Sequence, residues 1–280
     1  MSKVNGCKCN PVIRWVGGKS QLLPVIRDKM PSGYGRYYEP FMGGGALFFS
    51  LAPEEAVLND ANSGLINLYT QLRNNPDRVL DELDRLQGRY NSLPDLDTKK
   101  DIYYDLRTFY NQCTLDHINT PYSAALFVFL NKACFNGLYR ENSKGEFNTS
   151  FGKKKTLKTY ERDNVLNVSS LLTKATLLSG DYKDACHGAA NGDFVFFDPP
   201  YYDTFDTYKK GGFPDDEHRI MADLFKALTD KGVYCMLTNS NTEFIKDLYR
   251  EFQIEVVPVR RSVNRNGKGR TGEEVIITNY

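Results

Sequence analysis

The chain has 280 residues, of which 41% are hydrophobic and 25% charged, and its formal net charge is +1. This length can bury a large core in one domain, or in one domain with a substantial insertion, and the composition excludes a disordered, fibrous or small disulfide-stapled protein. With so little net charge, any affinity for nucleic acid must come from local clusters of Lys and Arg.

No segment has the pattern of a targeting or membrane-spanning element. The first residues, Met1 to Asn10, are polar, and the apolar run from Ala124 to Leu130 is too short to cross a bilayer. We therefore expect a cytoplasmic protein that does not bind a membrane. Among six cysteines, Cys7 and Cys9 form a close pair, but there is no second cluster of the kind that zinc needs. Reduced thiols and no metal are expected.

The first predicted elements alternate between strand and helix. A short strand, Arg36–Pro40, runs into a glycine turn and an apolar helix start, Ala46–Leu51. A second apolar stretch, Glu55–Leu58, ends in two polar residues, and a helical pattern from Leu65 to Leu72 follows it. The pattern predicts two strand–helix units.

The middle of the chain interrupts this alternation. From about residue 76 to residue 172, charged helical stretches such as Asp77–Tyr90 and Lys100–Asn111 replace it. We interpret residues 76–172 as an inserted subdomain, and residues 1–75 together with 173–280 as one domain.

Alternation of strands and helices resumes after the insertion. Two helical patterns, Asp216–Leu228 and Thr242–Phe252, lie between later strands, and a Gly- and Arg-rich loop, Asn264–Gly272, joins the last two. An α/β fold follows, with a mostly parallel sheet covered on both faces and a final antiparallel hairpin. The predicted strands of this part are Ala175–Gly180, Phe194–Asp198, Val233–Thr238, Ile254–Val259 and Val275–Asn279.

The glycine turn Gly43–Gly45 fits one kind of ligand better than others. Phe48 stands where a dinucleotide fingerprint has its third glycine, which disfavours NAD and FAD, and Ile13 stands where a phosphate-binding loop ending at Gly17–Ser20 would need glycine. Asp60, at the end of the next strand, can accept from both hydroxyls of a ribose. The pattern therefore fits adenosine without a diphosphate. The alternative is a tight turn, with Asp60 capping a helix.

The tetrapeptide Asp198–Tyr201 follows a very apolar strand, so it lies where ligands bind in open α/β sheets. Two prolines remove backbone donors and present carbonyl oxygens rigidly. The Asp198 carboxylate and the Pro199 carbonyl can accept both hydrogens of an exocyclic amine such as adenine N6 and aim its lone pair at a sulfonium methyl, and this transfer needs orientation and electrostatics. Tyr201 offers a ring for a flipped-out base. The alternative is a rigid turn with a packed tyrosine.

Together these motifs resemble those of the Dam-type DNA adenine-N6 methyltransferases. The similarity runs from Arg14 to the C-terminus and is weakest between about Pro76 and Pro121. It implies a Rossmann-like, seven-stranded methyltransferase sheet, and an enzyme that transfers methyl from S-adenosyl-L-methionine to adenine N6 in double-stranded DNA and leaves S-adenosyl-L-homocysteine. The matching stretches are Arg14-Trp15-Val16-Gly17-Gly18-Lys19, Glu39-Pro40-Phe41-Met42-Gly43-Gly44-Gly45, Asn59-Asp60-x-Asn62, Phe135-Asn136-Gly137-Leu138-Tyr139-Arg140, Gly145-Glu146-Phe147-Asn148, Asp198 to Tyr201, and Val259-Arg260-Arg261-Ser262.

The resemblance also implies roles for individual residues. Trp15 and Lys19 are expected to contact the cofactor, Asp60 to hold its ribose and Asp181 to lie near its adenine. On spacing alone, Trp15 would be an ordinary packed aromatic and Lys19 a solvated charge. The expected cofactor set is Trp15, Lys19, Glu39, Pro40, Phe41, Gly43, Asp60, Asp181 and Asp198, and the expected catalytic set is Asp198, Pro199, Pro200 and Tyr201.

The insertion resembles the target-recognition region of the family, with a hairpin that turns at Asn142–Gly145. In relatives that read GATC, residues matching Arg140 and Leu138 contact guanine and a thymine methyl, but these enzymes commonly carry proline where this chain has Ser150. GATC or a related short site is expected. Phe135 or Tyr139 would stack near the extruded base. The candidate DNA-binding residues are Phe135, Asn136, Leu138, Tyr139, Arg140, Asn148, Lys153 and Arg260.

Several alternatives stay open. Each DNA-binding candidate could instead be a solvated surface charge or a packed aromatic of the hairpin, with no role in DNA binding. Cytosine-N4 methylation uses the same chemistry, although enzymes with that activity more often have Ser in place of Asp198. A catalytically silent DNA-binding protein of the same fold is the rival from another class. A cognate restriction endonuclease is a possible partner. A basic cluster in the final hairpin is expected to face DNA or to order over the cofactor: Arg260, Arg261, Arg265, Lys268 and Arg270.

Overall fold

The computed structural model describes residues 9–202 and 213–260 and residues 271–280, and for Arg260 and Thr271 it describes the backbone alone. The expected basic cluster of the final hairpin therefore lies outside the described side chains. The strands occur where the apolar runs predict them. Their bounds are Tyr37–Glu39 (β1), Ala56–Asp60 (β2), Ala175–Ser179 (β3), Phe194–Phe197 (β4), Tyr234–Ser240 (β5), Gln253–Arg260 (β6) and Thr271–Thr278 (β7).

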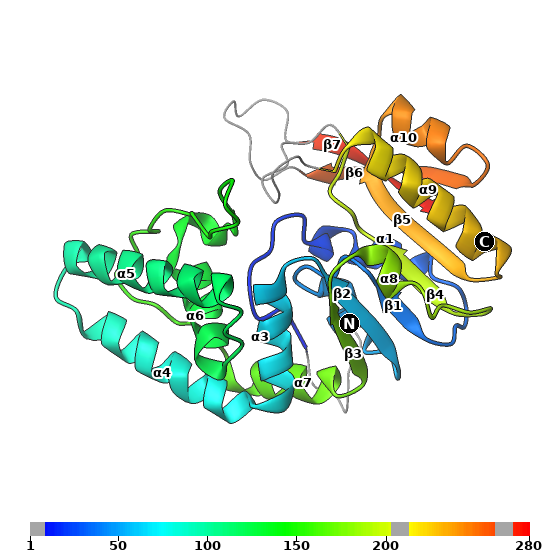
Figure 1. Ribbon diagram of the computed structural model, residues 1–280. Helices are drawn as coiled ribbons and strands as arrows, with labels where there is room; N and C mark the ends of the chain where they lie inside the picture. The colour runs from blue at the N-terminus through cyan, green and yellow to red at the C-terminus, as the bar shows by residue number, and fades with distance from the viewer. Residues whose placement is uncertain (1–8, 203–212, 261–270) are drawn as a thin grey trace.

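These strands form one seven-stranded sheet in the order β3-β2-β1-β4-β5-β7-β6 (Figure 1). Strands β1 to β5 are parallel to one another, and β7 runs antiparallel between β5 and β6. The expected mostly parallel α/β sheet with a C-terminal hairpin is confirmed. Because the chain builds outward from β1 to β3 and then returns to β4 on the other side, the carboxyl ends of β1 and β4 meet at a topological switch point, where such sheets bind ligands.

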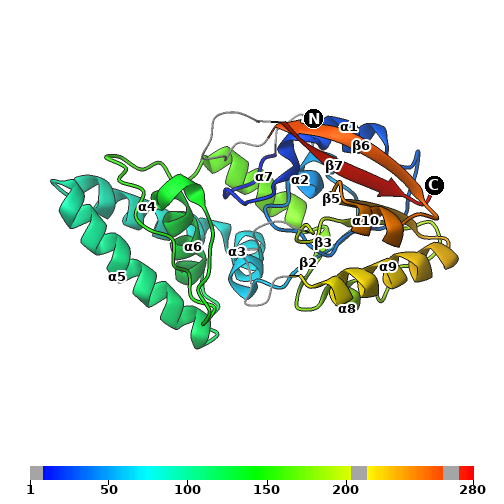
Figure 2. The ribbon, with the colours of Figure 1, turned by 90° about the horizontal axis from the view of Figure 1, so that it is seen from above.

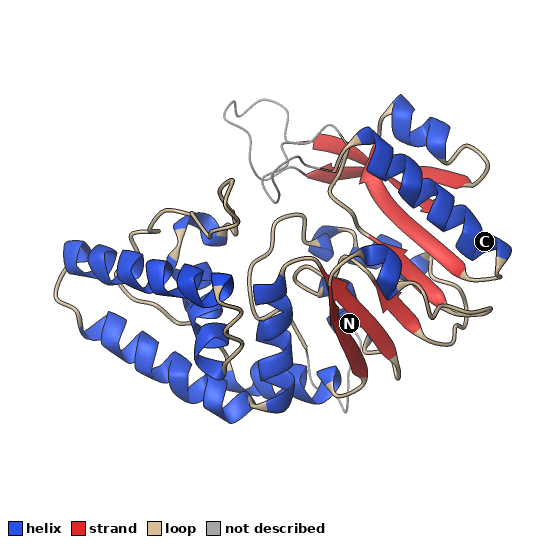
Figure 3. Ribbon diagram, in the orientation of Figure 1, coloured by secondary structure: helices blue, strands red, loops and turns tan. Residues whose placement is uncertain are grey.

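Helices cover both faces of the sheet (Figure 3). Alternate residues of β4 explain why: Phe194 and Phe196 join one buried cluster, while Val195 and Phe197 join another on the opposite face. Both clusters are apolar, so neither face of the central strand can meet water. The covering helices are Leu23–Asp28 (α1), Ala46–Leu51 (α2), Ser63–Asn74 (α3), Arg162–Leu172 (α7), Tyr182–Ala185 (α8), Asp215–Asp230 (α9) and Glu243–Leu248 (α10).

The middle of the chain forms three further helices, Pro76–Ser92 (α4), Leu96–Leu115 (α5) and Pro121–Ala133 (α6). Seen from above, they lie beside the sheet and not on either of its faces (Figure 2). Thr120 and Ser123 cap α6 reciprocally, and α6 is buried almost all round because it packs against α3, α4 and α5. The described chain contains no helix that has the length and hydropathy to cross a bilayer.

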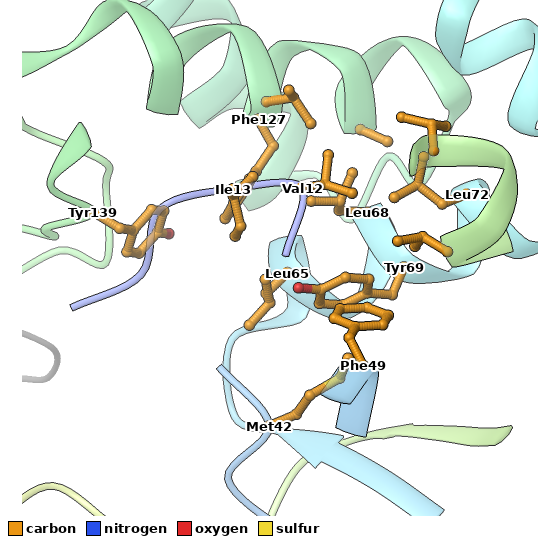
Figure 4. Close-up of a cluster of buried hydrophobic side chains, with 14 of the residues drawn as sticks. Val12, Ile13, Met42, Phe49, Leu65, Leu68, Tyr69, Leu72, Phe127 and Tyr139 are labelled. Atoms are coloured by element: carbon orange, nitrogen blue, oxygen red, sulfur yellow. The ribbon is translucent and has the colours of Figure 1, made fainter. Parts of the chain in front are cut away.

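Residues 76–172 and the sheet share a continuous core. Figure 4 shows buried side chains of the N-terminal segment, Val12 and Ile13, between Phe127 of α6 and the side chains of α3. Helix α7, the last element of residues 76–172, packs against α3 and α4. These contacts pack residues 76–172 against the elements that carry the turn after β1.

The expected hairpin turns at the predicted residues but is less regular than a strand pair. The backbone N–H of Gly145 donates to the Asn142 carbonyl, and that of Asn142 donates to Glu146. Pairing around this turn consists of single bridges between Glu141 and Phe147 and between Cys134 and Phe151. Side chains of the neighbouring helices form hydrogen bonds with backbone groups that a regular strand pair would bond to each other. For example, Asn111 of α5 bonds both the N–H and the carbonyl of Phe147.

Candidate active site

The Asp198 carboxylate lies at the end of β4, with its side chain 17% exposed. The Lys19 ammonium is 2.7 Å from its Oδ1, and the Thr238 hydroxyl donates to the same oxygen at 2.8 Å. Within the described residues, no group donates to Oδ2. Burial raises the pKa of Asp198, while Lys19 and then Thr238 lower it. One oxygen is thus held in place, and the other is available to a substrate.

The two groups that hold Asp198 come from distant parts of the chain. Thr238 is fully buried on β5, the strand beside β4. Lys19 is also buried, and its ammonium donates to the Gly17 carbonyl at 2.7 Å. The same ammonium lies 4.7 Å from the centre of the Tyr201 ring, within the range of a cation–π contact. Lys19 therefore links the glycine-rich N-terminal segment to the turn Asp198–Tyr201.

The rest of the tetrapeptide is fastened to the two strands beyond β4. The Tyr201 hydroxyl donates to Glu274 of β7 at 2.8 Å. The N–H of the next residue, Tyr202, donates to Asn239 Oδ1 at 2.9 Å, and its carbonyl accepts from the Ser240 hydroxyl at 2.7 Å. Pro199 is buried and Pro200 half-buried. The turn is consequently rigid, as a preorganised acceptor surface requires.

The glycine turn after β1 lies directly against Trp15 and Asp60. The N–H of Gly43 donates to Asp60 Oδ2 at 2.9 Å, and the N–H of Asn62 donates to Oδ1 at 2.8 Å. Gly43 has a φ of +48°, and a Cβ built on it would lie 2.7 Å from Trp15 Cδ1. Only glycine allows both this backbone conformation and this approach of the indole.

Replacing Gly43 by Ala should therefore disturb both the fold and the pocket. We expect a loss of about 1–2 kcal/mol in the free energy of unfolding from the left-handed backbone alone, together with displacement of Trp15. Chemical denaturation measures the first effect, and the emission of Trp15 the second. Gly88→Ala is the matched control, because Gly88 is exposed on α4 with no atom near the added methyl. It should gain about 1 kcal/mol in helix propensity. Equal stability of Gly43→Ala and the unmodified protein would contradict this assignment.

Three expected cofactor residues precede this turn. Glu39 is buried and accepts from the Tyr37 hydroxyl at 2.9 Å, and burial raises its pKa to about 8. Pro40 is buried, and its carbonyl accepts from Asn59. Phe41 is half-buried, with its ring stacked 5.0 Å from Tyr182. All three line the carboxyl end of β1, at the switch point.

Asp181 follows β3, which lies two strands from β1 in the sheet, and it is exposed. Its side chain caps α8 by accepting from the Lys183 N–H, and it forms an ion pair with the Lys183 ammonium at 3.1 Å. Asn59 joins this region to the turn, because its side-chain amide donates to the carbonyls of Pro40 and Gly180 at 2.9 and 3.1 Å. The structure thus brings the expected cofactor residues to one edge of the sheet.

The sequence comparisons agree with this geometry. A family model described as D12 class N6 adenine-specific DNA methyltransferase matches residues 15–263. The chain belongs to this family. It is 38% identical to the type II methyltransferase M1.LlaDCHI of Lactococcus lactis subsp. cremoris, over 99% of this chain and 97% of that protein. The resemblance drawn from the motifs is confirmed, and the protein is an adenine-specific DNA methyltransferase.

Other relatives of the methyltransferase cover nearly the whole chain as well. It is 36% identical to the type II methyltransferase M.MjaIII of Methanocaldococcus jannaschii, over 96% of this chain and 99% of that protein. It is 31% identical to a DNA adenine methylase of Vibrio cholerae, over 92% of this chain and 91% of that protein. The similarity therefore includes both the sheet and the inserted helices.

The candidate DNA-binding residues of the methyltransferase differ in accessibility. Phe135 is 55% exposed, whereas Tyr139 is 4% exposed, because its ring packs against Trp15 and Phe127 at 5.0 and 5.2 Å in a cluster of three rings. This burial leaves no face of Tyr139 for a base, so its expected contact with DNA does not fit the structure. The Arg140 guanidinium is exposed and donates to Asn148 at 2.7 Å. The other described candidates are Asn136 and Lys153, which are exposed, and Leu138, which is half-buried.

Several residues of this site were not singled out by motif reasoning. Thr238 sits inside an apolar strand and has no sequence mark of its own. In the sequence alone, Glu274 and Glu141 are indistinguishable from ordinary surface charges. Asn62 was visible in the sequence, because it stands at a helix start two residues after Asp60, where Asn commonly caps.

Proposed function

We propose that this methyltransferase transfers the methyl group of S-adenosyl-L-methionine to N6 of an adenine flipped out of double-stranded DNA, at GATC or a related short site. The observation that carries the proposal is the asymmetric Asp198 carboxylate. Lys19 and Thr238 both donate to Oδ1, so Oδ2 can accept one hydrogen of the amine while the Pro199 carbonyl accepts the other. The amine lone pair then points out of the base plane.

The residues present fit the cofactor. Its sulfonium supplies an electrophilic methyl group when it is bound. A carboxylate accepts about four hydrogen bonds, so Asp60 can hold the backbone amides of Gly43 and Asn62 together with a ribose diol. Trp15 lies against the same turn and offers a flat apolar surface. Buried Glu39 and the Asp198–Lys19 pair occupy the adjoining strand ends.

The insertion supports DNA as the substrate. Arg140 suits a bidentate contact to guanine, and exposed Phe135 suits a wedge where a base has left the stack. The hydrogen bond to Asn148 holds the exposed Arg140 side chain in place, and Lys153, nearby in the chain, is also exposed. We assign Asn136 and Leu138 to the same surface. Arg260, at the end of β6, is proposed as a phosphate contact.

The names of the relatives bear on the biological setting. Two of them are called type II methyltransferases, and on this basis a cognate restriction endonuclease is a candidate partner. The target sequence follows from Arg140 and Leu138, which match residues that read GATC, and Ser150 is the departure that makes a related site the alternative.

Methyl transfer from labelled S-adenosyl-L-methionine to unmethylated plasmid DNA, with the product mapped by modified-base sequencing, tests the proposal. We expect N6-methyladenine confined to GATC or to one related short site. N6-methyladenine at unrelated sites would overturn the assignment of Arg140 and Leu138. N4-methylcytosine would establish the rival amine, and tight DNA binding with no transfer would establish a silent reader.

A further inference from the structure

The carboxylate of Glu141 joins the recognition hairpin to the cofactor side of the protein. Glu141 directly follows Arg140 and is half-buried. Its Oε1 accepts from the Tyr139 hydroxyl at 2.6 Å and from the Asn62 side-chain amide at 3.0 Å. Asn62 lies 79 residues earlier in the chain, at the start of α3. A single carboxylate oxygen therefore ties two parts of the fold together.

The first branch from Glu141 leads to Trp15. The Tyr139 ring is buried in a cluster of three rings, in which it packs against both Trp15 and Phe127 (its position beside the N-terminal segment is seen in Figure 4). A buried hydroxyl needs an acceptor, and Glu141 supplies one. This hydrogen bond holds the hydroxyl end of the Tyr139 ring in place. Trp15 in turn rests against Gly43. The position of the indole at the cofactor turn thus depends on the bond between Tyr139 and Glu141.

The second branch leads to Asp60. The side-chain oxygen of Asn62 accepts from the Leu65 N–H at 2.8 Å and caps α3, while its backbone N–H donates to Asp60 at 2.8 Å. Because Glu141 takes the side-chain N–H, the Asn62 amide has one orientation, with its oxygen toward the helix. Asp60 also accepts from Gly43. Both branches therefore end at the same turn and close a ring of contacts.

We propose that Glu141 is a positioning residue for the cofactor pocket, acting from the recognition hairpin by holding Tyr139 behind Trp15 and Asn62 behind Asp60. The inference rests on the proposed binding of S-adenosyl-L-methionine at Trp15 and Asp60. Without the carboxylate, a buried hydroxyl and an amide lose their acceptor, and both pocket residues gain freedom. Cofactor affinity falls as a result, even with no DNA present.

The experiment is a titration of S-adenosyl-L-homocysteine without DNA, followed by the emission of Trp15, the single tryptophan of the chain. Glu141→Ala should bind it roughly tenfold more weakly than the unmodified enzyme. Glu146→Ala is the matched control, since it removes the same charge from the same hairpin, where the Glu146 carboxylate accepts from the Asn142 side-chain amide at 2.7 Å. It should bind S-adenosyl-L-homocysteine normally. Glu141→Gln keeps an oxygen that accepts both bonds, and should restore the affinity to within about twofold of the unmodified value.

Unchanged affinity in Glu141→Ala, with weaker DNA binding alone, would overturn the inference. An equal loss in Glu141→Gln would assign the effect to charge and overturn the positioning role. If Glu141→Ala does not fold, Tyr139→Phe takes its place, because it removes one bond and keeps the stacked ring, and normal affinity in that variant would also overturn the inference. Failure of the unmodified enzyme to bind S-adenosyl-L-homocysteine would instead contradict the proposed function.

Discussion

Replacing Asp198 by Asn is expected to lower kcat by about a thousandfold, in line with the loss of a preorganised electrostatic contact. The local geometry explains the severity. Lys19 and Thr238 both donate to Oδ1, so they would hold the carbonyl oxygen of the new amide. Its NH2 group would then take the place of Oδ2 and present donors to an amine that also donates. The substitution therefore replaces a hydrogen-bond acceptor for the amine by a donor, and it also removes the negative charge.

Single-turnover methyl transfer to plasmid DNA measures this effect, and a gel-shift titration measures DNA binding by the same variant. DNA affinity should remain within a few fold of normal, since the polar contacts of Asp198 among the described residues are with Lys19 and Thr238 and not with residues 76–172. Asp230→Asn, which makes the same change at an exposed position at the end of α9, is the control for both assays. Normal turnover in Asp198→Asn would remove Asp198 from its role as amine acceptor.

Replacing Lys19 by Met should move the acidic limb of the kcat–pH profile to higher pH. Asp198 accepts the amine hydrogens only when it is ionised. Burial raises the pKa of Asp198, and Lys19 is the largest influence that lowers it. Without Lys19 the pKa of Asp198 rises further, so a higher pH is needed to ionise it. Activity is thus lost at low pH and recovered at high pH.

The measurement is kcat at saturating S-adenosyl-L-methionine across the pH range, which separates this effect from weaker cofactor binding. Lys226→Met is the control, because Lys226 pairs with Glu251 on the surface, away from the site. Its profile should match that of the unmodified enzyme. A Lys19→Met variant whose activity falls equally at every pH would show that Lys19 acts through the cofactor and not through the ionisation of Asp198.

The sequence by itself determined the main elements of the fold and the two ends of the site. Apolar runs of strand length and the helical periodicity between them depend on local burial, so Phe194–Phe197 and Ala46–Leu51 could be placed without knowledge of their neighbours. A polar residue directly after a parallel strand faces the ligand edge of the sheet, which singled out Asp60 and Asp198. These features are local, and a linear pattern contains them.

Only the tertiary structure decided which side chains act together. Thr238 reaches Asp198 because β5 lies beside β4, and Lys19 reaches it because Asn131 of α6 bonds both the N–H and the carbonyl of Arg14 and so fixes the N-terminal segment. The same packing buries Tyr139, which the hairpin sequence had suggested for DNA. Such contacts depend on strand order and on the shared core between insertion and sheet, and residues far apart in the chain carry no local sign of them.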